Sequence, residues 1–184
     1  MAKPFYLSFS SEVNHVTGPA LIAAIGHQMA TGHDEAHLLL TTPGGRVDMG
    51  LMIYNVLRSL PIKVITYNVG TVNSIGNMIF LAGVERYAAP TSSFMFHGVG
   101  FDVQNARFEE KALKERLTGL QNDQKLIADV IVRHTNISAA DVGKLFLEAA
   151  FVTADDAKAR GIVNDVIEIK IPEGATFLQL AFQG

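Results

Sequence analysis

Short apolar runs alternate with segments of helical spacing along the first part of this chain. Residues 5–9 (FYLSF), 37–41 (HLLLT) and 62–67 (IKVITY) are apolar or alternating runs of the kind that forms strands. Between them, apolar positions in residues 17–29 and 47–57 recur at the three- and four-residue intervals of a helix. Strand, helix and strand in this order predict βαβ units around a buried, mostly parallel sheet.

The alternation continues toward the C-terminus. Further elements are expected as a helix at 74–82, strands at 86–89 and 92–97, a helix at 105–134 and a strand at 163–171. Ser138 with Asp141, and Thr153 with Asp156, have the spacing of capping boxes, which predicts two short helices. Gly161 ends the second of them. Beyond 171 the sequence shows only an apolar cluster at Phe177, Leu178, Leu180 and Phe182.

The helix expected at 105–134 is long for a compact domain, so we expect it to protrude. Its apolar stripe contains Leu113, Leu117, Leu120, Ile127 and Ile131, which need a covering surface. A mean hydropathy of +0.23 is also high for a monomer without a membrane span. Both features predict self-association.

The composition of the chain excludes several classes of function. The 184 residues fit one domain, 1–184, with 48% hydrophobic and 18% charged residues. A net charge of -3 gives no field that would attract nucleic acid or an anionic membrane, so neither is an expected partner. With no cysteine, thiolate chemistry and Cys-ligated metals are excluded. The sequence shows no signal-peptide pattern, which predicts a cytoplasmic protein.

Ser74 lies in the segment from Gly70 to Gly76, between an expected strand and helix. Its hydroxyl would lie near the unpaired N–H groups at the start of the helix, where it could act as a nucleophile. The alternative is that Ser74 only caps the helix, a position where serine is generally favoured. The α/β-hydrolase pattern G-x-S-x-G is not met, because Val72 replaces its first glycine.

His97 ends an alternating strand and is followed by the flexible Gly98-Val99-Gly100, so it is either a catalytic base or a structural strand-end residue. The remaining histidines have no metal-ligand spacing and are read as surface or helix-end residues: His15, His27, His33, His37 and His134. The Gly44-Gly45 pair can expose backbone N–H groups to a ligand. No phosphate-loop or dinucleotide pattern is present, so no cofactor and no metal are expected.

Together these motifs resemble the proteolytic subunit of Clp proteases, the ClpP family. The similar stretches run from Thr42-Pro43-Gly44-Gly45-Arg46-Val47 through Gly50, Ile53-Tyr54, residues 70–76, Leu81-Ala82-Gly83, Ser92 and Met95-Phe96-His97. They continue with His134-Thr135, Phe151-Val152-Thr153-Ala154, Ala157, Gly161 and Val163. The resemblance therefore covers nearly the whole chain.

The resemblance implies an α/β fold of the ClpP/crotonase type, a spiral of ββα units with a long protruding handle helix between stacked rings. It implies Ser74 as nucleophile and His97 as general base. The backbone N–H groups of Gly45 and Ile75 match the family's oxyanion hole, which would stabilise charge in the transition state. The expected activity is that of an intracellular serine endopeptidase acting on short or unfolded peptides inside an oligomeric chamber.

Two departures from the family stand out. The slot of the triad aspartate holds Ala149, so the third triad member is unknown. The adjacent Glu148 would point to the opposite face of an extended segment, away from His97. Few residues precede the strand at 5–9, so the N-terminal segment that contacts a Clp-type ATPase has no counterpart, which argues against that partner.

Three hypotheses follow. The leading one is a ClpP-like peptidase, weak or working with a Ser74 and His97 dyad alone. The second is a catalytically silent ring subunit, which Ala149 favours. The third is a crotonase-type acyl-CoA enzyme, for which the sequence offers no CoA-specific feature.

Overall fold

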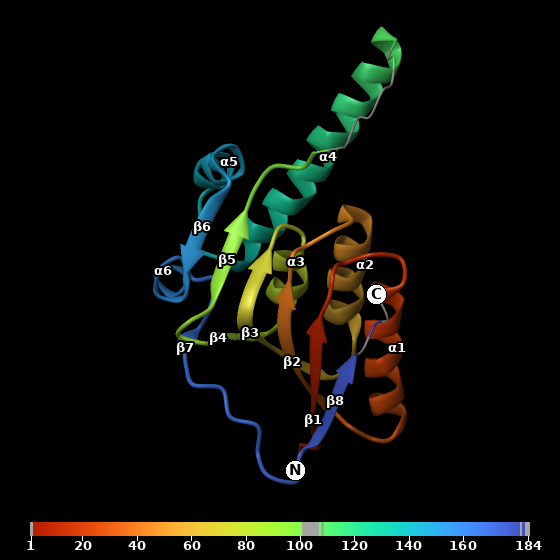
Figure 1. Cartoon of the computed structure of the whole chain (residues 1–184), viewed down its shortest axis with the longest axis vertical. Coiled ribbons are helices and arrows are strands. Elements are labelled where there is room, and N and C mark those ends of the chain that lie inside the picture. Colours follow the sequence, from red (N-terminus) through yellow and green to blue (C-terminus); the bar gives the residue numbers. More distant parts are fainter. Residues whose placement is uncertain (1, 101–106, 108, 181, 183–184) are drawn as a thin grey trace.

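A single, mostly parallel sheet lies at the centre of the computed structural model, which describes residues 2–100, 107, 109–180 and 182 (Figure 1). The strands are β1 (Pro4–Ser10), β2 (Glu35–Thr42), β3 (Lys63–Asn73), β4 (Glu85–Ala88), β5 (Ser93–Phe96), β6 (Ala150–Thr153), β7 (Asp165–Val166) and β8 (Thr176–Leu180). The helices are α1 (Thr17–Ala30), α2 (Val47–Ser59), α3 (Gly76–Leu81), α4 (Glu110–His134), α5 (Ala139–Glu148) and α6 (Ala154–Ala159). The predicted α/β class is confirmed.

Strand β3 is the branch point of the sheet, because its two ends pair with different strands. The main path runs β6-β5-β3-β2-β1-β8, and only the β5–β6 pair is antiparallel among the described residues. The first half of β3 pairs with β4 and its last residues, from Thr71 to Asn73, pair with β5. The β3 strand therefore continues past β4 and ends beside β5, which brings residue 74 close to the strand that precedes His97.

The two faces of the sheet are covered differently. Side chains alternate along β1, so Phe5, Leu7 and Phe9 enter the main core with α1, α2 and α3, whereas Tyr6 faces the other side. On that other side Tyr6, Leu39, Ile65 and Tyr67 form a smaller cluster. The segment between β7 and β8 covers it with Ile167, Ile169 and Ala175.

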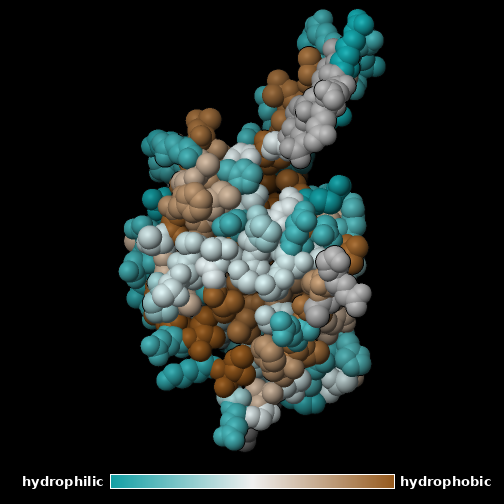
Figure 2. All heavy atoms as spheres, in the orientation of Figure 1, coloured by the Kyte–Doolittle hydropathy of each residue, from teal (hydrophilic) through white to brown (hydrophobic). Residues whose placement is uncertain are grey.

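Helix α4 projects from the body of the molecule, as the family resemblance led us to expect (Figure 1). Its inner half belongs to the core, where Ile127 and Ile131 are buried. On its outer half, Leu113 and Leu117 remain 47% and 54% exposed, and Figure 2 shows apolar side chains along this part of the helix. The residues 105, 106 and 108 of the helix predicted at 105–134 lie outside the described part.

Several predicted boundaries were wrong. Strand β3 runs to Asn73 instead of ending at Tyr67, and the strand expected at 163–171 is reduced to the two residues of β7. Strands β6 and β8 were not predicted. Both capping boxes are confirmed, because Ser138 Oγ accepts from Asp141 N and Thr153 Oγ1 accepts from Asp156 N.

No helix in the part of the chain that the structure describes is long and apolar enough to cross a bilayer.

Candidate active site

Ser74 occupies a tight turn between the end of β3 and the start of α3. Its φ of 56° lies in the left-handed region, which costs a non-glycine residue about 1–2 kcal/mol. The N-cap of α3 is Ile75, without a side-chain capping bond, so the helix-cap interpretation of Ser74 is wrong. Within the described residues, the Ser74 hydroxyl has no hydrogen-bond partner. A strained turn therefore presents a half-buried serine whose hydroxyl is unused.

The glycine loop after β2 packs directly against this turn. A Cβ on Gly44 would lie 2.6 Å from the Ser74 Cβ, so only glycine fits there. A Cβ on Gly45 would lie 2.2 Å from the carbonyl oxygen of Val13, and Gly45 has a φ of 142°. The loop is thus held between Ser74 on one side and the Val13 backbone on the other.

The Gly45 N–H is not used by the bridge that fixes the loop. Val13 N donates to Gly44 O at 2.7 Å, and Arg46 N donates to Val13 O at 2.8 Å. The Gly45 N–H makes no hydrogen bond in the described structure, and neither does the N–H of Ile75 at the start of α3. Two unpaired backbone donors therefore lie next to the Ser74 turn.

A small pocket of about 100 Å³ opens at this point. Its lining includes Ser74, His97, Gly45 and Ile75, the four candidates from the sequence. Most of its remaining walls are apolar: Val47, Met78, Phe96, Gly98, Val99, Gly100, Ile127 and Phe146. The pocket is suited to an aliphatic side chain beside a reacting carbonyl group.

His97 follows the last residue of β5 and is exposed. Its imidazole makes no hydrogen bond with the described residues, so Ser74 and His97 share a pocket without being joined by a hydrogen bond. Backbone contacts fix the segment instead, because Gly98 N donates to Phe146 O at 3.0 Å. Hydrogen bonds of catalytic pairs are often long in unliganded enzymes and shorten on substrate binding.

Ala149, at the position that the resemblance assigns to the triad aspartate, lies beside His97. Phe96 pairs with Ala150 in the antiparallel register of β5 and β6, which places His97 next to Ala149. Ala149 is the left-handed C-cap of α5, with a φ of 49°. Glu148 is the last residue of α5 and lines a different cavity of about 740 Å³ with Lys144 and Arg160. The expected extended conformation at 148–149 was wrong, and Glu148 lines no part of the Ser74 pocket.

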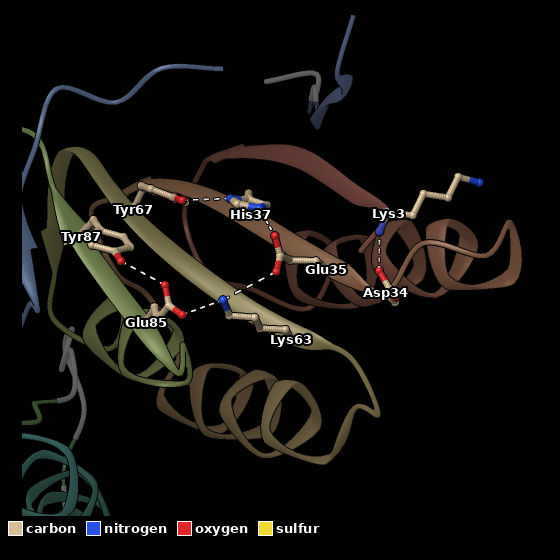
Figure 3. Close-up of polar contacts among 8 residues, drawn as sticks. All are labelled: Lys3, Asp34, Glu35, His37, Lys63, Tyr67, Glu85 and Tyr87. Atoms are coloured by element: carbon tan, nitrogen blue, oxygen red, sulfur yellow. Dashed lines mark hydrogen bonds and ion pairs between the residues drawn. The ribbon is translucent and has the colours of Figure 1, made fainter. Parts of the chain in front are cut away.

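A group of ionisable side chains lies on the face of the sheet that carries Tyr6 and Ile65, away from the main core (Figure 3). Its members are Glu35, His37, Lys63, Tyr67, Glu85 and Tyr87. His37 contacts Glu35 and Tyr67 at 2.9 Å each, and Lys63 contacts Glu85 at 2.6 Å. The Lys63 hydrogen bond lowers the pKa of Glu85, and the same bond raises the pKa of Lys63. Both groups are held in their charged forms, and we interpret the network as a structural link between β2, β3 and β4.

The reading of the other histidines as surface or helix-end residues was wrong for His37, which is 8% exposed in the middle of this network. It was also wrong for His33, a buried loop residue between α1 and β2. His134 does end α4, but it is only half-exposed and hydrogen-bonds with the Tyr54 hydroxyl at 2.8 Å. Burial lowers the pKa of His134 to about 4, assisted by the nearby Arg58, Arg86 and Arg133.

One residue near the site escaped the sequence analysis. Asn77 is 1% exposed in α3, and its side-chain amide donates to the carbonyl oxygens of Ser74 and Met95. The only sequence signal was a lone polar residue in the apolar segment GNMIFL.

The Ser74 turn at the end of β3 lies between the glycine loop after β2 and His97 after β5. A serine hydroxyl, an imidazole and unpaired backbone N–H groups therefore come together at one end of the sheet, which is the set of groups that nucleophilic acyl transfer uses. A family model described as Clp protease matches residues 5–170. The chain belongs to the Clp protease family, whose members are in general serine peptidases.

The fold agrees with this assignment. The structure is similar to a solved structure of a ClpP1 mutant from Listeria monocytogenes, with a TM-score of 0.72 and 21% sequence identity. The similarity covers 90% of this chain and 92% of that one. It supports the ClpP/crotonase-like fold, and the family match favours a peptidase over a crotonase-type acyl-CoA enzyme.

Proposed function

We propose that this chain is a serine endopeptidase that cleaves short or unfolded peptides with Ser74 as nucleophile and His97 as general base. The observation that carries the proposal is the shared pocket of Ser74, His97 and Gly45, in which the serine hydroxyl has no structural partner among the described residues. A serine hydroxyl that is not bonded to the backbone of its own turn is available to donate its proton to a general base.

In the proposed reaction, Ser74 Oγ attacks the carbonyl carbon of the peptide while His97 accepts the hydroxyl proton. The negative charge that develops on the carbonyl oxygen is stabilised by the N–H groups of Gly45 and Ile75. The C–N bond then breaks, and His97 donates its proton to the leaving amine. In the second half, His97 accepts a proton from water as its oxygen attacks the acyl carbon, the bond from that carbon to Ser74 Oγ breaks, and His97 returns the proton to Oγ as the acid product leaves.

The absence of an acid at Ala149 limits the expected rate. In a serine triad the carboxylate orients the imidazole and stabilises its protonated form. Ala149 can do neither, and Glu148 lines a different cavity. We therefore expect slow turnover by a dyad of Ser74 and His97.

Peptide hydrolysis tests the proposal. Wild-type protein is expected to cleave a set of fluorogenic peptides with aliphatic residues before the cleaved bond, and Ser74→Ala and His97→Ala are expected to abolish cleavage. Ser59→Ala and His15→Ala are matched controls, because both residues are exposed and outside the Ser74 pocket. Cleavage that persists in Ser74→Ala would contradict the proposal.

A second candidate function is that of a silent subunit in a ring with an active relative, and the missing acid beside an unbonded His97 favours it. Members of the ClpP family generally form rings and work with Clp ATPases. Self-association of this chain into rings is part of our proposal under either function. Inactivity of both the wild type and Ala149→Asp would favour the silent subunit.

A further inference from the structure

We propose that Asn77 is a positioning residue, whose buried amide ties the strained Ser74 turn to strand β5 and thereby fixes the nucleophile relative to His97. This inference rests on the proposed function of Ser74 and His97. It concerns a residue that contacts neither substrate nor the reacting atoms, and that acts only through the backbone of the turn.

The contacts form a closed set of hydrogen bonds. The Asn77 side chain donates through Nδ2 to Ser74 O and to Met95 O, both at 2.9 Å. The Asn77 backbone N–H also donates to Ser74 O at 3.1 Å, and Ser74 N donates to Met95 O at 2.8 Å. Each of the two carbonyl oxygens thus accepts two hydrogen bonds, and the three residues are held as one unit.

The orientation of the amide follows from its partners. Carbonyl oxygens only accept hydrogen bonds, so the Nδ2 group must face Ser74 and Met95. The Oδ1 atom then points elsewhere, and it is buried without a partner among the described residues. An unpaired buried acceptor is unfavourable, and an apolar side chain would avoid that cost. The presence of asparagine is therefore best explained by the two bonds that it donates.

These bonds act on the two backbone segments whose positions the reaction requires, the Ser74 turn and strand β5. A serine in the left-handed region keeps that conformation only where its surroundings enforce it, and the Asn77 bonds hold the Ser74 carbonyl. Met95 precedes His97 by two residues and pairs with Asn73 across β3 and β5. The same amide thus sets the turn that carries the nucleophile and the strand that carries the base.

The test compares Asn77→Ala with Asn68→Ala. Asn68 is also buried. Its Nδ2 donates to Ser93 O at 2.8 Å and its Oδ1 accepts from Gly70 N at 3.1 Å, so it too joins β3 to β5. It does not contact Ser74. Both variants lose a buried amide-to-carbonyl link between β5 and the chain before it, but only Asn77→Ala loses a side-chain hydrogen bond to the Ser74 turn. Asn77→Ser, which keeps one donor in a smaller side chain, serves as the partial rescue and as a substitute if Asn77→Ala does not fold.

Three readouts are needed: peptide kinetics, the rate of Ser74 modification and hydrogen–deuterium exchange. For Asn77→Ala we expect kcat for a fluorogenic peptide and the rate of Ser74 modification by a fluorophosphonate to fall by about ten- to a hundredfold, with KM nearly unchanged. Hydrogen–deuterium exchange in the peptide 70–78 should become faster. Asn68→Ala should keep kcat within about threefold of wild type, and Asn77→Ser should lie between the two alanine variants.

Several outcomes would overturn the inference. One is a modification rate in Asn77→Ala, or in Asn77→Ser if the alanine variant does not fold, equal to that of wild type. Another is an equal loss of kcat in Asn68→Ala, which would indicate general destabilisation. If wild-type Ser74 is not modified at all, the proposed function fails, and the exchange readout decides the structural part alone: unchanged exchange at 70–78 in Asn77→Ala would refute it.

Discussion

At the residue scale, Ala149 occupies the position beside His97 in a left-handed conformation that aspartate tolerates better than alanine. We predict that Ala149→Asp raises kcat for peptide hydrolysis by tenfold or more, because a carboxylate there would orient the His97 ring. Loss of the corresponding acid costs about 10⁴-fold in the trypsin system. Steady-state kinetics on a fluorogenic peptide measure the gain.

The control for this gain is Ala149→Gly. Glycine removes the backbone strain without adding a carboxylate, so it should stabilise the protein by about 1 kcal/mol and leave kcat unchanged. Glu148→Gln should also have little effect, because Glu148 lines a different cavity from Ser74. A large loss of activity in Glu148→Gln would show that Glu148 is the third member of the triad.

His134 should make stability depend on pH in a defined window. Its pKa is about 4 in the folded protein and about 6.5 when unfolded, so the folded state binds fewer protons between these values. The contribution of His134 to the free energy of unfolding is therefore complete above about pH 6.5 and is lost as the pH falls toward 4. We predict that His134→Gln shows a smaller decrease of Tm than wild type between pH 7.5 and 4.5. The Tm of His15→Gln, a substitution at an exposed position, should decrease over this pH range by as much as that of wild type.

At the element scale, the glycine loop depends on its close approach to Val13. We predict that Gly45→Ala destabilises the protein by about 1–3 kcal/mol, because the loop must move to relieve the contact with Val13 O. Movement of the Gly45 N–H should also lower kcat by about 10²–10³-fold. Thermal unfolding and peptide kinetics measure the two effects. Gly26→Ala, in α1 with open space around it, should instead be slightly stabilising.

The elements that the sequence predicted best are those with strong local patterns. Strands β1 and β2 and helices α1 and α2 were predicted within a few residues, because buried apolar runs and helical periodicity are visible locally. Strand β8 was missed because it depends on parallel pairing with β1, at the other end of the chain. The strand expected at 163–171 was wrong beyond Val166, because Ile167 and Ile169 cover the second face of the sheet instead of continuing strand β7.

The residues of the candidate site were predictable from the sequence, but their surroundings were not. Ser74, His97, Gly45 and Ile75 came from motif resemblance, and the structure brings all four to one pocket. The environment of Ala149 and Glu148 was not predictable, because the end of α5 and the left-handed cap leave no clear local signal. The role of Asn77 depends on the distant Met95 backbone, which no local pattern reveals.

At the scale of the whole molecule, the outer half of α4 exposes leucines that a monomer would leave in water (Figure 2). Burying a leucine between subunits contributes about 1.5–3 kcal/mol. We predict a particle several times heavier than 19.9 kDa, and a shift toward smaller particles for Leu117→Glu. Thr118→Glu, an exposed polar position on the same helix, is the matched control. Light scattering that gives a monomer for wild type at micromolar concentration would contradict this prediction.

The central claim, that Ser74 is an activated nucleophile, is tested most directly by mass spectrometry after treatment with a fluorophosphonate. We expect one adduct per chain, on the proteolytic fragment that contains Ser74, and no adduct in Ser74→Ala. His97→Ala should slow the modification strongly, because the serine would lose its base. Wild-type protein that stays unmodified, or an adduct of the same extent in Ser74→Ala, would contradict the account.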